Sequence, residues 1–127
     1  MFDIDYFKTV NDHYGHIVGD KVLINLTKAV NSNLREGDIF FRYGGEEFVV
    51  VLPGFSSKDV TKSAEQIRHI TEDMETRHQS QVLNITVSVD GASYPEHDAE
   101  KADGLLKDVD VTMYQAKESG RNMSMVD

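Results

Sequence analysis

The segment Asp38–Gly54, DIFFRYGGEEFVVVLPG, constrains the fold more than any other part of the chain. Two runs of β-forming residues, Ile39–Arg42 and Phe48–Leu52, stand close together and predict a β-hairpin. Glycine supplies the positive φ of a tight turn, so the turn alone accounts for Gly44 and Gly45. It does not account for Glu46 and Glu47, because paired carboxylates repel each other unless a positive charge lies between them.

The rest of the chain alternates between strand and helix patterns. We expect a short strand at Phe2–Ile4, helical turns over Asp5–His13 and a glycine-punctuated loop over Tyr14–Asp20. Helical spacing covers Lys21–Arg35, Ser57–His78 and Ala99–Ser119, while Gln81–Tyr94 alternates as a strand with hairpin-turn residues at Asp90-Gly91. This order predicts an α+β domain in which helices flank a mainly antiparallel central sheet.

The composition excludes several classes of protein. The length of 127 residues suits one domain, and the net charge of −9 argues against a broad surface for nucleic-acid polymers or anionic membranes. There is no cysteine, hence no disulfide and no thiolate metal site. No apolar run could span a bilayer and no signal peptide opens the chain. We expect a cytoplasmic domain without membrane contact of its own, either in a cytoplasmic protein or as the cytoplasmic part of a larger or membrane-anchored one.

Acidic residues stand at the ends of two predicted strands. Asp3 and Asp5 lie at the end of the first strand, and Glu46 and Glu47 lie in the hairpin turn. If the strand ends are neighbours, these carboxylates converge, and Mg²⁺ binds such oxygens together with substrate phosphates. Glycines at the turn would let a phosphate or ribose approach the backbone. The pattern favours a Mg²⁺-dependent nucleotide site as one hypothesis.

Basic and amide side chains that suit a nucleotide occur elsewhere. Lys8 follows the first acidic pair, and Lys117 and Arg121 lie one turn apart at the end of the last helix, where basic residues also satisfy the helix dipole. Asn11 and Asp20 match the donors and acceptors of guanine, but they equally suit helix caps or loops.

Four ordered motifs resemble the GGDEF domain, the diguanylate cyclase family. They are DIDYFKTVNDHYGHIVGD (Asp3–Asp20), RYGGEEF (Arg42–Phe48), NITVSV, and VDVTMYQAKESGRN (Val109–Asn122). The resemblance covers nearly the whole chain, with the signature in its glutamate-containing form. It implies a fold like the catalytic palm of nucleotide cyclases and a reaction that condenses two GTP into cyclic di-GMP with release of two pyrophosphates.

The resemblance also assigns roles to residues. It implies that Asp3, Glu46 and the Ile4 backbone carbonyl ligate Mg²⁺ or Mn²⁺, with Glu47 supporting the metal site. Guanine would be held by Asn11 and Asp20, and the phosphates by the Phe7 backbone, Lys8, Lys117 and Arg121, with Gly44 and Gly45 leaving room for the nucleotide. The implied catalytic residues are Glu46, Glu47 and Lys8. One domain binds one GTP, so catalysis would need a homodimer.

Some family features are missing. The usual helix with a DxLTGLxNR motif and a complete first strand are absent, so residues 1–127 are expected to be an N-terminally truncated GGDEF domain from a longer protein with an upstream sensor or regulatory domain. Asp90 stands where the family has glycine, which leaves the local strand path open. The alternative to an active cyclase is a non-catalytic receptor module for GTP or cyclic di-GMP, and retention of the whole motif set favours the cyclase.

Arg35 and Asp38 form an R-x-x-D pair shortly before Gly44. Without a family context, the pair has a structural explanation: Arg35 ends a helix that Gly37 stops, and Asp38 belongs to the turn before the next strand. Its spacing from the glycines resembles the family's inhibitory site, which binds the product cyclic di-GMP. The resemblance therefore implies an allosteric product site at Arg35 and Asp38.

Overall fold

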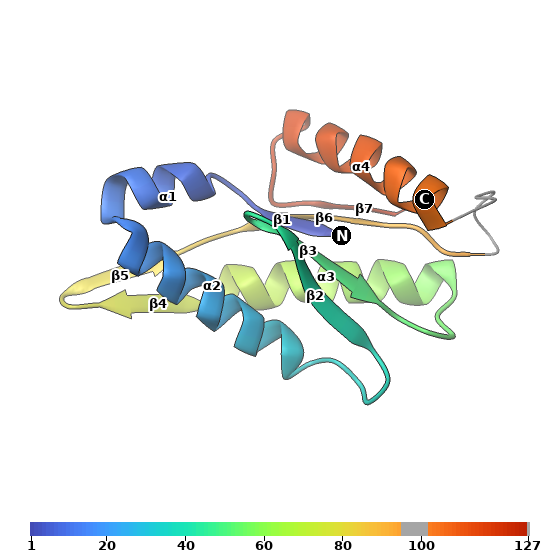
Figure 1. Cartoon of the computed structure of the whole chain (residues 1–127), viewed down its shortest axis with the longest axis horizontal. Helices are drawn as coiled ribbons and strands as arrows, with labels where there is room; N and C mark the ends of the chain where they lie inside the picture. Colours follow the sequence, from blue (N-terminus) through green and yellow to red (C-terminus); the bar gives the residue numbers. More distant parts are fainter. Residues whose placement is uncertain (95–101, 127) are drawn as a thin grey trace.

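The computed structural model describes residues 1–94 and 102–126. In chain order the elements are β1 (Phe2–Ile4), α1 (Phe7–Tyr14), α2 (His16–Asn31), β2 (Ile39–Gly44), β3 (Glu47–Val51), α3 (Ser57–Asp73), β4 (Glu75–His78), β5 (Gln81–Asn84), β6 (Val87–Gly91), α4 (Ala102–Glu118) and β7 (Ser124–Val126) (Figure 1). The described strands form a five-stranded sheet in the order β2-β3-β1-β6-β7 and a separate two-stranded β4-β5 hairpin. In the large sheet only the described β6–β7 pair is parallel, which confirms the mainly antiparallel α+β fold.

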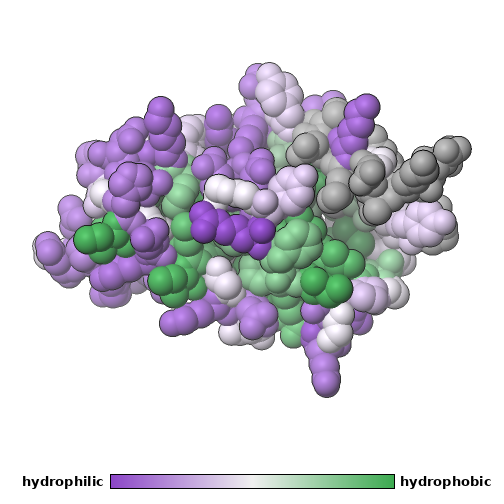
Figure 2. Space-filling view, viewed as in Figure 1, coloured by the Kyte–Doolittle hydropathy of each residue, from purple (hydrophilic) through white to green (hydrophobic). Residues whose placement is uncertain are grey.

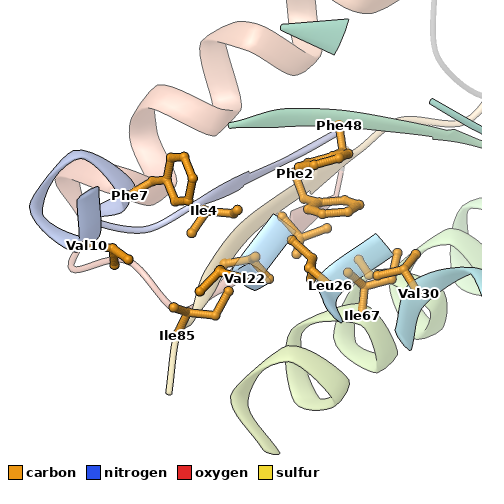
Figure 3. Close-up of a cluster of buried hydrophobic side chains, with 13 residues drawn as sticks. Phe2, Ile4, Phe7, Val10, Val22, Leu26, Val30, Phe48, Ile67 and Ile85 are labelled. Carbon is orange, nitrogen blue, oxygen red and sulfur yellow. The ribbon is translucent and has the colours of Figure 1, made fainter. Parts of the chain in front are cut away.

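The helices cover both faces of the sheet. Figure 1 shows α4 on one side and α2 and α3 on the other. On α2 the apolar residues recur every fourth position, so Val18, Val22, Leu26 and Val30 form one buried stripe. Val22, Leu26 and Val30 of this stripe lie in one core cluster with the stacked rings of Phe2 and Phe48, whose centroids are 5.2 Å apart (Figure 3). The short strand β1 is thereby held at the centre of the core.

The loop expected over Tyr14–Asp20 is wrong. Helix α2 begins at His16, and Gly15 with φ 87° separates it from α1. A single residue with positive φ is enough to redirect the chain, so no longer loop is needed. At its other end α2 stops at Asn31, and Arg35 lies in the following turn rather than on the helix.

The helix expected over Ser57–His78 is too long. Helix α3 ends at Asp73, and Glu75–His78 forms β4, which pairs with β5. Thr76 is buried between the exposed Glu75 and Arg77, and it accepts a hydrogen bond from Asn25 Nδ2 at 3.2 Å. This pairing joins segments that are distant in sequence, so local helical spacing did not reveal it.

The predicted strand Gln81–Tyr94 is two strands, β5 and β6, and the predicted turn at Asp90-Gly91 is wrong. Strand β6 continues through both residues and pairs with β7, which the pattern did not indicate. A Cβ atom on Gly91 would lie 2.6 Å from Val60 Cγ1 of α3. The glycine therefore allows α3 to approach the sheet, and Asp90 leaves the path of β6 regular.

The closing helix is confirmed over Ala102–Glu118, and residues 99–101 of the predicted range lie outside the described part of the chain. Val109, Met113 and Ala116 are buried, as their spacing predicted. None of the helices in residues 1–94 and 102–126 combines the length and apolar character needed to cross a membrane.

The edge hairpin exposes apolar side chains. Ile39, Phe41 and Tyr43 alternate along β2, and Val51 stands opposite Ile39 on β3; all four are more than two-fifths exposed. Hydrophobic residues also gather near the β2–β3 hairpin on the face seen in Figure 2. This stripe remains available for contact with another surface.

Candidate functional site

Three segments of the chain meet at the end of β1. The amide of Ile4 donates a hydrogen bond to the carbonyl oxygen of Glu46 at 3.2 Å, and Asp3 lies opposite Glu47 in the β1–β3 register. The hairpin turn with Gly44 and Gly45 is thus held against the strand that carries Asp3. The N-terminus of α1 and the C-terminus of α4 reach the same end of β1, where Lys117 contacts Asp3 and Arg121 lies over the Tyr6 ring.

Asp3 is a buried carboxylate with a positive neighbour, Lys117, and two negative neighbours, Glu46 and Glu47. It is 3% exposed, its Oδ2 lies 2.6 Å from Lys117 Nζ, and its Oδ1 has no hydrogen-bond partner. Burial raises the pKa of Asp3 to about 6, against the opposing effect of Lys117, and the charges of Glu46 and Glu47 raise it further. The buried, unpaired oxygen is therefore an acceptor that a cation could satisfy.

The donor set at this site fits Mg²⁺ or Mn²⁺. Asp3, Glu46 and the Ile4 carbonyl supply hard oxygen atoms, and Asp3 Oδ1 is free to coordinate. Within the described residues, no three acidic, histidine or cysteine side chains are grouped closely enough to enclose a metal ion by themselves. This arrangement suits Mg²⁺, which typically takes one or two carboxylates and completes its shell with water and substrate phosphates.

The expectation that four carboxylates converge is wrong, because Asp5 is used elsewhere. Its two oxygens accept hydrogen bonds from Thr86 Oγ1 at 2.7 Å, Ser88 Oγ at 2.7 Å and the Asn122 amide at 3.0 Å. Asp5 therefore ties β1 to β6 and to the turn after α4.

Basic groups approach the end of β1 from two sides. Lys117 in the last turn of α4 contacts Asp3, and Arg121 lies with its guanidinium carbon 4.4 Å from the centre of the Tyr6 ring. Tyr6 is the N-cap of α1, and no side chain caps this helix end. The Phe7 amide and the exposed Lys8 therefore begin a helix whose first N–H groups suit an anion.

Asn11 and Asp20 come from the two helices that pack against each other beside Gly15. Gly19, which sequence reasoning overlooked, decides how closely they approach. A Cβ atom at this position would lie 1.9 Å from Asn11 Oδ1. The missing side chain at residue 19 thus leaves room for the Asn11 amide against α2, one residue before Asp20 in the sequence. A glycine inside a helix, where it lowers helix stability, was the available signal.

Arg35 and Asp38 form a preorganised pair. The guanidinium donates to Asp38 Oδ1 at 3.0 Å and to the Pro53 carbonyl at 3.2 Å, and it lies 4.0 Å from the centre of the Phe55 ring. Hydrogen bonds from Arg35 hold the pKa of Asp38 below its ordinary value. The Arg35 side chain is 54% exposed, so this ordered guanidinium remains open to a ligand.

Together the fold and this site define a class: palm-like α+β domains with acidic and basic side chains gathered at the end of a central strand. A family model described as "Diguanylate cyclase, GGDEF domain" matches residues 1–123. The chain belongs to the GGDEF domain family.

Curated relatives agree with this assignment. The chain is 43% identical over 124 residues to the response regulator PleD of Caulobacter vibrioides and 39% identical over 122 residues to diguanylate cyclase A of Treponema denticola. Each match covers 96% of this chain, but only 27% of PleD and 33% of diguanylate cyclase A. The chain therefore spans a third or less of the length of these relatives.

Solved structures show the same fold. The diguanylate cyclase SiaD of Pseudomonas aeruginosa, in complex with its activator SiaC, matches with a TM-score of 0.89 at 32% identity, over 99% of this chain and 48% of SiaD. The active GGEEF domain of a diguanylate cyclase from Vibrio cholerae gives 0.86 at 31% identity, over 98% and 78%. The GGDEF domain of DgcB from Caulobacter crescentus, in complex with c-di-GMP, gives 0.87 at 30% identity, over 98% and 72%.

Proposed function

We propose that this domain is a diguanylate cyclase that condenses two GTP into cyclic di-GMP and two pyrophosphates. The observation that carries the proposal is the buried Asp3, whose free Oδ1 lies beside the Glu46-Glu47 turn while Lys117 neutralises its other oxygen. A buried carboxylate with one unused oxygen and acidic neighbours is suited to a divalent cation that arrives with a phosphate chain.

The chemistry divides among the residues by charge. Asp3, Glu46 and the Ile4 carbonyl would hold the metal ion, with Glu47 in support. When bound, Mg²⁺ lowers the pKa of the attacking 3′-hydroxyl and stabilises the entering and leaving oxygens. Lys8, Arg121 and the Phe7 amide would offset charge on the triphosphate. Lys117 has three N–H donors, so its ammonium could keep its contact with Asp3 Oδ2 and also donate to a phosphate.

Two copies of the domain are needed because each copy provides one GTP site. The 3′-hydroxyl held by one copy attacks the α-phosphate held by the other, and the product closes when the reaction is repeated. Glu46 is the family's proposed general base, but a carboxylate bound to a metal ion is a weak base. We therefore assign Glu46 mainly to metal ligation.

The direct test is GTP turnover with Mg²⁺ at high protein concentration, with the product identified by mass. Activity should rise faster than linearly with protein concentration, because the competent state is a dimer. If the chain binds GTP tightly but forms no cyclic di-GMP, even when it is fused to a dimerising segment, the result would instead support a receptor module.

Gly19→Ala is expected to weaken binding of a GTP analogue about tenfold, the loss of roughly one hydrogen bond to the base. The new Cβ displaces Asn11 Oδ1, the end of a flexible side chain, so the free energy of unfolding should hold or rise because alanine favours helix. Isothermal titration and urea unfolding measure the two effects. In an Asn11→Ala background, Gly19→Ala should not lower the affinity for the GTP analogue any further. An equal loss of affinity there would show that Gly19→Ala does not act through Asn11.

Arg35→Ala is expected to relieve inhibition by added cyclic di-GMP while GTP affinity stays nearly unchanged. The ordered, half-exposed guanidinium can stack on a guanine face and donate to its Hoogsteen edge or to a phosphate. Turnover measured against cyclic di-GMP concentration tests this expectation. Arg77→Ala is the matched control, since Arg77 is also exposed and paired with a carboxylate, Glu75, on the distant β4. If cyclic di-GMP inhibits Arg35→Ala as strongly as wild type, Arg35 and Asp38 have only a structural role in the turn and do not bind the product.

A further inference from the structure

The turn after α4 is held in an uncommon backbone conformation. Arg121 and Asn122 follow Gly120 with φ values of 64° and 44°, in the left-handed region that non-glycine residues seldom adopt. Two such residues in succession persist only where the surroundings hold them. The conformation therefore calls for contacts that fix this turn.

The contacts that fix the turn come from β1 and α3. Asp5, which is 4% exposed, accepts a hydrogen bond from the Asn122 amide at 3.0 Å while its other bonds anchor it to Thr86 and Ser88. On the other side, Arg68 Nη1 donates to Asn122 Oδ1 at 3.1 Å, and Asn122 Nδ2 donates to Glu72 at 3.2 Å. Asn122 is thus clamped between the end of β1 and α3.

The residues next to Asp5 and Asn122 in the sequence carry the groups that would contact a nucleotide. Arg121 precedes Asn122, and Tyr6 follows Asp5; Arg121 lies over the Tyr6 ring, with its Nη1 3.3 Å from the Tyr6 hydroxyl. Tyr6 also has a positive φ of 55°, and it is 61% exposed at the N-terminus of α1. One buried carboxylate therefore holds the backbone on both sides of the Tyr6–Arg121 stack.

We propose that Asp5 and Tyr6 are positioning residues that aim the Arg121 guanidinium at the phosphates of a nucleoside triphosphate bound at the N-terminus of α1. A guanidinium stacked on a ring loses less side-chain entropy on binding than a freely rotating one. The ordered guanidinium therefore strengthens binding of the phosphate chain and not of the base. This inference rests on the proposed function for its ligand, whereas the ordering of Arg121 by Asp5 does not depend on it.

Isothermal titration with a non-hydrolysable GTP analogue and with GMP tests the phosphate target. Asp5→Asn keeps the shape of the side chain but removes the charge and one acceptor, and Tyr6→Leu removes the ring at an exposed position that leaves the fold intact. Each variant should bind the GTP analogue about tenfold more weakly and GMP within twofold of wild type. Tyr6→Phe keeps the stacking ring and should bind the GTP analogue nearly as wild type does.

Double variants separate positioning from a general structural effect. In an Arg121→Ala background, neither Asp5→Asn nor Tyr6→Leu should weaken the GTP analogue further. Equal losses for GMP and the GTP analogue, or losses that add to that of Arg121→Ala, would overturn the inference.

A measurement without nucleotide distinguishes this inference from the proposed function. The Arg121 Nε–H proton should show an upfield ring-current shift in the NMR spectrum, which Tyr6→Leu removes and Asp5→Asn reduces. A shift unaffected by Asp5→Asn would overturn the positioning role even if GTP binds. A wild-type chain that binds neither nucleotide would overturn the proposed function and the phosphate target, while the ring-current shift would still report whether Asp5 orders Arg121.

Discussion

Glu46→Gln is expected to reduce GTP turnover about 10³-fold, because it removes a charged group that acts directly where charge develops. The fold should be unaffected, since the contact that anchors this turn to β1 is the hydrogen bond from the Ile4 amide to the Glu46 backbone carbonyl. The glutamine side chain has the same shape but is a far weaker ligand for Mg²⁺. Initial rates at saturating GTP and Mg²⁺ give the measurement.

The matched control is Glu75→Gln, which makes the same chemical change at an exposed position on β4. It should leave the rate within twofold of wild type. If Glu46→Gln kept a tenth or more of the activity, then Glu46 would not be a metal ligand in the reacting complex, and the metal site would have to be built from Asp3 and Glu47.

Asp3→Asn is expected to stabilise the protein while it abolishes Mg²⁺-dependent nucleotide binding. The pKa of Asp3 is raised from 3.8 to about 6, so the folded state holds the proton more tightly than the unfolded state does. Above about pH 6, Asp3 is ionised in the folded state, and the cost of burying its charge lowers the free energy of unfolding by the full amount. This destabilisation fades as the pH falls from about 6 toward 4, because the buried carboxyl then takes up a proton. With 1.36 kcal/mol for each pKa unit, asparagine should gain on the order of 3 kcal/mol at pH 8.

Urea unfolding at pH 8 and at pH 4.5 measures the stability of both proteins, and calorimetric titration with a GTP analogue measures binding with and without Mg²⁺. The advantage of Asp3→Asn should shrink at the lower pH. Lys117 loses its partner in the variant, but its side chain is 26% exposed and can turn to solvent. Asp5→Asn is the matched control and should destabilise the protein at pH 8, because that carboxylate accepts three hydrogen bonds. A variant that is less stable than wild type at pH 8, or that still binds the Mg²⁺ complex as tightly, would contradict this account of Asp3.

Much of the architecture follows from local patterns in the sequence. The β-forming runs on either side of Gly44-Gly45 specify the hairpin, and the four-residue spacing of Val22, Leu26 and Val30 specifies the buried face of α2. These features were predictable because each element expresses its own periodicity. One exception is the first turn of α2, where two glycines close together resembled a loop although only Gly15 breaks the helix. Another is Asp90-Gly91, which has the residues of a hairpin turn but lies in the strand β6.

The sequence alone placed Asp3 at the end of a strand and Glu46 in a turn, and it matched both to a known family. Only the tertiary structure decided which carboxylates share a site: Asp3 faces the hairpin and Lys117, whereas Asp5, two residues later, is bound to β6 and to Asn122. The strand β7, the β4–β5 pair and the close contacts of Gly19 and Gly91 were also decided there. The physical reason is common to all of them: each depends on a partner far away in the sequence, and a residue's own pattern does not record which distant group will occupy the space beside it.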